Sequence, residues 1–115
     1  MTYSQYKGIN IGSGQHYRDG WFNIDAIATD KGRQPDMLLD IFNLPVAFPE
    51  PVFPRAYVGH VLEHINYSDV ATAVRCIADV VKPGGIVMVV GPCIEKAVAT
   101  NQPEWLIEGD RKSTR

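Results

Sequence analysis

Residues 86–90 read IVMVV, an apolar run that would place no polar side chain on either face of a strand. Strands of this kind belong inside a parallel sheet, because helices cover both faces of such a sheet. The preceding residues fit this arrangement. An apolar stripe at helical spacing is formed there by Val70, Val74, Ile77 and Val81. We therefore expect a helix that packs this stripe against the sheet.

The expected helix has recognisable ends. Ser68 is a favourable N-cap residue, and Asp69 suits the first turn because a carboxylate is stabilised near a helix N-terminus. Residues 83–85, PGG, stop the helix and turn the chain toward the strand. Segment 43–54 carries four prolines, so we expect no regular helix there.

Shorter runs with strand-like composition come earlier in the chain, at residues 8–11, 21–25, 37–40 and 55–59. Strands that alternate with a helix indicate an α/β fold. We expect a Rossmann-like, mostly parallel sheet of about five strands.

The chain has 115 residues, which suits a single domain over residues 1–115 with a frayed polar tail at 109–115. The net charge of −2 gives no indication of nucleic-acid binding. No apolar run reaches the length of a membrane span, and the N-terminus lacks the apolar segment of a signal peptide. Cys76 and Cys93 form no C-x-x-C pair, so we expect a cytoplasmic protein with reduced thiols.

Glycines and acids lie at the predicted strand ends. Ligands of open parallel sheets bind outside the carboxyl ends of the strands. Gly12-Ser13-Gly14 lets the backbone approach a ligand closely, and Asp25 is placed to accept hydrogen bonds from a ribose diol. Asp40 could meet an exocyclic amine of a base. This order predicts a site for an adenosine-containing cofactor.

Several nucleotide cofactors are disfavoured by the same loop. The dinucleotide fingerprint G-x-G-x-x-G requires a third glycine where Tyr17 stands, and the phosphate loop G-x-x-x-x-G-K-[ST] is absent. The glycine loop has no Lys or Arg for a pyrophosphate. A cofactor with one adenosine and an amino-acid tail fits better than NAD or a nucleotide sugar.

The motifs INIGSG, GWFNID, LLDIFNLP, HVLEHI and VVKPGGIVMVV occur in order over roughly residues 8–92. Together they resemble the class I S-adenosylmethionine-dependent methyltransferases, in particular small predicted members with a short first connection. The resemblance implies S-adenosyl-L-methionine as the cofactor and transfer of a methyl group to an acceptor that the sequence does not identify.

The resemblance also implies roles for individual residues. The loop around the methionine part of the cofactor corresponds to Gly12, Ser13 and Gly14. Asp25 corresponds to the acid that binds the ribose hydroxyls. Asp40 and Ile41 correspond to the pair beside adenine. Gly59 and His60 correspond to the residues next to the sulfonium and the acceptor entrance. His60 is also the candidate catalytic base. Asn10 is included as a cofactor-binding candidate, because many relatives have an acid there that orients the loop or the cofactor's amino group.

The stretch HVLEH, residues 60–64, also fits the zinc-protease pattern H-x-x-E-H. That pattern requires both histidines on one helix. His60 instead follows the strand-like run 55–59, and His64 falls in the turn that comes next. We therefore expect no metal site here.

Departures from the family leave other interpretations open. Ten residues separate Gly14 from Asp25, too few for the usual first helix. Only 23 residues follow Pro92, with at most one helix around 97–107, so we expect a fold truncated relative to the usual seven strands. The outer edge of 86–90 would then require a second copy or a longer natural chain. The alternative to an enzyme is a non-catalytic binding or interaction module.

Overall fold

A six-stranded sheet forms the centre of the computed structural model, which describes residues 3–91 and 95–99. The strands are β1 (Ile9–Ile11), β2 (Phe22–Asp25), β3 (Met37–Leu38), β4 (Phe53–Gly59), β5 (Val81–Val90) and β6 (Glu95–Ala99). Their spatial order is β3-β2-β1-β4-β5-β6. The first five strands are parallel, and β6 runs antiparallel to β5. The order 3-2-1-4-5 reverses direction beside β1, so the predicted α/β, Rossmann-like fold is confirmed.

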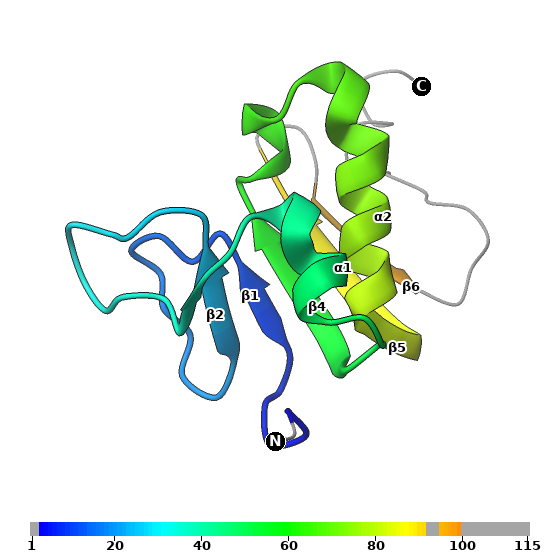
Figure 1. The fold of residues 1–115 in the computed structure, drawn as a ribbon, viewed down its shortest axis with the longest axis horizontal. Helices are drawn as coiled ribbons and strands as arrows, with labels where there is room; N and C mark the ends of the chain where they lie inside the picture. Colours follow the sequence, from blue (N-terminus) through cyan, green and yellow to red (C-terminus); the bar gives the residue numbers. More distant parts are fainter. Residues whose placement is uncertain (1–2, 92–94, 100–115) are drawn as a thin grey trace.

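The helical elements connect these strands. They are η1 (Ile41–Asn43), α1 (Leu44–Ala47), η2 (Leu62–His64), η3 (Tyr67–Asp69) and α2 (Val70–Val80). Figure 1 shows α1 and α2 over the same face of the sheet. The predicted stripe is confirmed for Val74 and Ile77, which are buried on α2. No helix within residues 3–91 and 95–99 is long and apolar enough to cross a bilayer.

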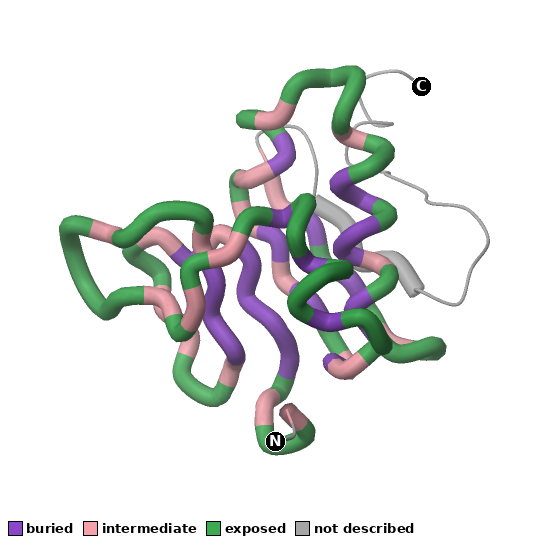
Figure 2. The backbone as a smooth tube through the Cα atoms, in the orientation of Figure 1, coloured by how far each residue is buried: buried purple, intermediate pink, exposed green. Residues whose placement is uncertain are grey.

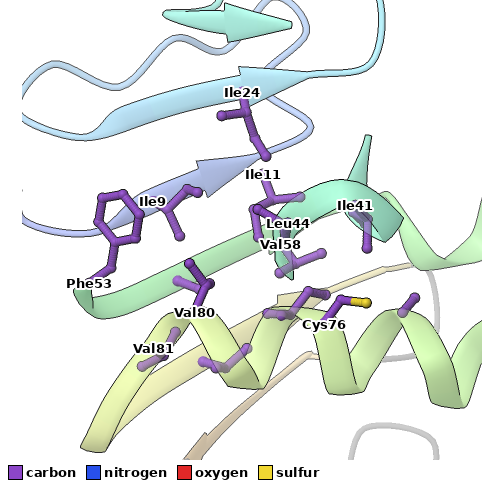
Figure 3. Close-up of a cluster of buried hydrophobic side chains, with 14 of the residues drawn as sticks. Ile9, Ile11, Ile24, Ile41, Leu44, Phe53, Val58, Cys76, Val80 and Val81 are labelled. Atoms are coloured by element: carbon purple, nitrogen blue, oxygen red, sulfur yellow. The ribbon is translucent and has the colours of Figure 1, made fainter. Parts of the chain in front are cut away.

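The core lies between α2 and the central strands (Figure 2, Figure 3). Ile9 and Ile11 of β1 and Val58 of β4 are at most 1% exposed, and Val80 of α2 is buried with them. Complete burial of one such aliphatic side chain contributes about 1.5–3 kcal/mol relative to exposure. The central strands are therefore held firmly, and their carboxyl ends form a rigid base for a site.

The opposite face of the sheet is covered differently. Loop 12–21 joins β1 to β2 without a helix, as its length predicts. The Arg18 guanidinium of this loop stacks 4.0 Å from the centre of the Tyr57 ring on β4. Further along the same face, Ile86 and Met88 of β5 remain 44% and 42% exposed. An arginine with its hydrophobic stem thus shields part of this face in place of a helix.

The prediction that this chain leaves the outer edge of β5 without a strand is wrong, whereas the second copy or longer natural chain stays a prediction. Residues 95–99 form β6 instead of starting a helix at 97, and they pair from Val90 opposite Glu95 to Ile86 opposite Ala99. An open edge presents unpaired backbone donors and acceptors, and antiparallel pairing with the segment that follows satisfies them. The rest of the expected helix, the tail 109–115 and Cys93 lie outside the described residues.

Two local predictions also require correction. Ser68 does not cap α2, because the chain already turns within η3 and Asp69 becomes the N-cap residue, without a side-chain capping bond. Segment 43–54 does contain one helical turn, α1. Its proline, Pro45, is tolerated because the N–H groups of a first helical turn have no partner within the helix.

Candidate functional site

The glycine loop leaves the sheet where β1 ends. The backbone N–H groups of Gly12 and Ser13 both donate to the carbonyl oxygen of Ile24, at 2.9 and 3.0 Å. Gly12 has a φ of 75°, and a Cβ atom added there would lie 2.3 Å from Cγ2 of Val61. Only glycine fits this position, because it tolerates the left-handed backbone and the close approach of Val61.

Asp25, the last residue of β2, ties this loop to the end of its strand. Its Oδ2 atom accepts a hydrogen bond of 2.7 Å from the N–H of Gly14. Its Oδ1 atom is 3.5 Å from the N–H of Ile27, a weak contact. Because a carboxylate has about four acceptor positions, Asp25 retains capacity to accept hydrogen bonds from a ligand.

The prediction that Asp40 ends the third strand is wrong, because β3 stops at Leu38. Asp40 is the N-cap residue of η1, and its Oδ1 atom accepts a hydrogen bond of 2.8 Å from the N–H of Phe42. A short acidic side chain that binds the backbone two residues ahead favours a turn over an extended strand. The chain therefore leaves the sheet before Asp40 and brings Ile41 into the core.

His60 follows β4 directly, as predicted from the strand-like run before it. Its backbone N–H donates to the carbonyl oxygen of Val90, at 2.6 Å, and its φ is 58°. A left-handed backbone at a residue other than glycine costs of order 1–3 kcal/mol, and such strained residues cluster at active sites and ligand-binding sites.

These strand ends surround one pocket of about 410 Å³, within the range of small-molecule sites. It is lined by Ile11, Gly12, Asp25, Ala26, Ile27, Leu39, Asp40, Ile41, Phe42, Gly59, His60, Val61, His64 and Ile65. The sequence-predicted residues that line it are Gly12, Asp25, Asp40, Ile41, Gly59 and His60. The pocket therefore brings together residues as far apart in the chain as Ile11 and Ile65.

Three predicted residues do not line this pocket: Asn10, Ser13 and Gly14. Gly14 contacts the pocket only indirectly, because its N–H donates a hydrogen bond to the lining residue Asp25. Ser13 is buried, and its Oγ atom has no hydrogen-bond partner within the described structure. Asn10 is buried too, and its Nδ2 atom donates to the carbonyl of His16 at 3.0 Å and to Oδ1 of Asn23 at 2.7 Å. Asn10 thus anchors the loop that replaces the first helix.

The HVLEH stretch is divided between a strand end and a turn. His60 follows β4, whereas Leu62–His64 forms the 3₁₀ turn η2, so the two histidines do not share a helix. Glu63 lies between their imidazole rings. Among residues 3–91 and 95–99, no group of three or more His, Cys, Asp or Glu side chains could hold a metal ion.

The sequence interpretation missed several lining residues, of which Ile27, Phe42 and His64 are the most informative. Ile27 and Phe42 each stand two residues after a predicted acid, and both are exposed. An apolar residue two positions after a predicted ligand-binding acid is the signal that could have identified them. The sequence presents His64 only as part of the H-x-x-E-H pattern, although it lies one turn beyond His60.

Two side chains that do not line this pocket, Tyr17 and Cys76, have raised pKa values. A hydrogen bond from its hydroxyl to Asp36 raises the pKa of Tyr17, with smaller contributions from burial and from the negative charge of Asp36. Burial raises the pKa of the free Cys76 thiol in the core. Both shifts follow from local structure and give no indication of a second reactive site.

Comparison with known protein families matches residues 16–89 to the methyltransferase domain family. This range covers more than half of the chain and includes β2 to β4, α2 and most of β5. The chain belongs to the class I methyltransferases. No curated protein and no solved structure matches it. The matched range contains Asp25, Asp40 and His60 of the pocket, whereas the glycine loop precedes it.

Proposed function

We propose that this methyltransferase domain binds S-adenosyl-L-methionine in the pocket at the strand ends and transfers its methyl group to an acceptor. The observation that carries the proposal is the lining itself: Gly12, Asp25, Asp40 and His60 share one pocket at the carboxyl edge of the parallel sheet. Ligands of open α/β sheets bind at this edge.

The lining residues fit this cofactor chemically. Asp25, which keeps acceptor capacity beyond its bond to Gly14, would accept hydrogen bonds from the ribose hydroxyls. Asp40 and Ile41 would lie beside adenine, with the carboxylate facing polar atoms and the side chain of Ile41 forming apolar contact. Gly12 has no side chain to block a close approach of the amino-acid part.

The acceptor side would be formed by Gly59 and His60 after β4. When bound, S-adenosyl-L-methionine supplies a methyl group activated by a positively charged sulfur. The residues of this chain would hold the acceptor in line with that group and exclude water, which is the main contribution of a protein to such a displacement. His60 would take a proton from an acceptor that must lose one.

Calorimetry tests the proposal with three ligands: S-adenosylmethionine, S-adenosylhomocysteine and NAD. We expect the first two to bind and NAD not to bind. Asp25→Ala should weaken S-adenosylhomocysteine binding by about 1–3 kcal/mol, or about 5- to 150-fold, because buried ribose hydroxyls lose their partner. Asp30→Ala, which removes an exposed carboxylate outside the pocket lining, is the matched control. Equal affinity in wild type and Asp25→Ala would refute the assignment.

A further inference from the structure

The carboxylate of Glu63 lies between two imidazole rings at the pocket. Its Oε1 atom is 3.7 Å from Nδ1 of His60, and its Oε2 atom is 3.9 Å from Nε2 of His64. Both histidines line the pocket, whereas Glu63 does not. The side chain of Glu63 is 31% exposed, compared with 62% and 75% for the histidines. The carboxylate therefore belongs to the least exposed of the three side chains.

The backbone around this group limits how far it can move. A Cβ atom added at Gly91, directly after β5, would lie 3.2 Å from Oε1 of Glu63, so the carboxylate is packed against that strand end. His60 is held from the same direction, since its N–H donates to the carbonyl oxygen of Val90. The left-handed backbone of His60, with φ 58°, would relax in the absence of such restraints. Two neighbouring strand ends thus hold the backbone of His60 and the carboxylate of Glu63.

We propose that Glu63 is a positioning residue that keeps the proton of neutral His60 on Nδ1 and leaves Nε2 as the proton acceptor toward the pocket. This inference deepens the proposed methyl transfer and rests on it. A carboxylate beside one imidazole nitrogen favours the tautomer that carries its proton there. The 3.7 Å separation is longer than a hydrogen bond. Catalytic contacts are often long without substrate and tighten when it binds.

The arrangement indicates the class of acceptor. A base beside the methyl donor is useful for a nucleophile that bears a proton, such as a hydroxyl or an N–H group. In that reaction the nucleophile forms a bond to the methyl carbon, and the carbon–sulfur bond breaks with its electron pair going to sulfur. The proton of the nucleophile moves to Nε2 of His60, and the resulting imidazolium faces the negative charge of Glu63. The second carboxylate oxygen faces His64 in the same way.

Nitrogen NMR of the imidazole rings tests the proposal without an acceptor. The ¹⁵N shifts of His60 and His64 would be recorded at alkaline pH in the wild type, in Glu63→Gln and in Glu50→Gln. Glu50 is an exposed glutamate outside the pocket lining and provides the matched control. An unperturbed histidine ring prefers the Nε2–H tautomer. We expect mainly Nδ1–H at His60 in the wild type and in Glu50→Gln, and mainly Nε2–H in Glu63→Gln.

His64 serves as an internal reference, because its Nε2 atom faces Glu63 and should carry the proton in all three proteins. Mainly Nε2–H at His60 in the wild type, or the same tautomer in wild type and Glu63→Gln, would overturn the proposal. Calorimetry with S-adenosylhomocysteine separates it from the proposed function: we expect an affinity within about twofold of wild type for Glu63→Gln. The wild type failing to bind that ligand would refute the proposed function instead, and with it the acceptor class inferred from it.

Discussion

Replacing Asn10 by aspartate is the most informative perturbation of this fold, because it exchanges a buried hydrogen-bond donor for an acceptor without changing the size of the side chain. Both hydrogen bonds that Asn10 makes in the described structure through Nδ2 are donated, to the carbonyl of His16 and to Oδ1 of Asn23. Asn23 cannot turn its amide to compensate. Its Oδ1 atom also accepts from the N–H of Arg18, and its Nδ2 atom donates to the carbonyls of Arg18 and Trp21. A carboxylate at position 10 would therefore face two acceptor oxygens.

The expected cost follows from these contacts. Losing these two hydrogen bonds, one buried and one part-buried, costs about 1–3 kcal/mol, which is the effect expected for Asn10→Ala. In Asn10→Asp the buried carboxyl group would take up a proton in the folded state and restore one of the bonds. Holding a carboxyl of ordinary pKa about 3.9 in its protonated form at about pH 7 costs about 4 kcal/mol. The aspartate variant should thus be less stable than the alanine variant near neutral pH.

The same reasoning sets the direction of the pH dependence. The folded state of Asn10→Asp would bind one more proton than the unfolded state, so its free energy of unfolding, relative to the asparagine parent, falls as pH rises. The slope is about 1.4 kcal/mol per pH unit. Urea unfolding followed by tryptophan fluorescence at about pH 5 and pH 7 measures the difference. An aspartate variant no less stable than the alanine variant at about pH 7, without this slope, would refute the hydrogen-bond assignment.

Three further predictions follow from the site and its surroundings. His60→Gly should be more stable than His60→Ala by about 1 kcal/mol in thermal unfolding, because only glycine relieves the left-handed backbone; the reverse order would contradict the strain. Gly12→Ala should lose about 1–3 kcal/mol of stability, part of which Val61→Ala restores in the double variant, because the added Cβ meets Cγ2 of Val61. The raised pKa of Tyr17 means that its bond to Asp36 stabilises the fold below the ordinary tyrosine pKa of about 10 and is lost as pH rises through the folded value. The Tm advantage of wild type over Tyr17→Phe should therefore disappear in alkali, and an advantage that persists there would disprove the contact.

Much of the fold and part of the site could be predicted because the relevant signals are local. The apolar run 86–90 and the stripe that contains Val74 and Ile77 depend on short-range periodicity, which survives in the folded chain as β5 and α2. As predicted, Asp25 ends β2 and His60 directly follows β4, and the carboxyl ends of parallel strands meet at one edge. Six of the nine site residues predicted from these signals line one pocket in the structure.

Other features could not be predicted because they depend on backbone groups that only the assembled sheet leaves unsatisfied. The sequence indicates the open edge of β5, but short-range periodicity does not reveal that residues 95–99 pair with it as β6. Serine is a favourable N-cap residue, but Ser68 lies within the turn η3, and α2 begins only at Val70.

By itself, the sequence determined that the chain forms a parallel α/β sheet and which polar residues stand at the strand ends, because periodicity and turn residues act over a few positions. Only the tertiary structure decided that Asn10 supports the loop instead of lining the pocket, and that Glu63 stands between two histidines. Both outcomes depend on the direction in which a side chain points once separate strands are paired. A change of one position in that pairing would turn the same residue to the other face of the sheet.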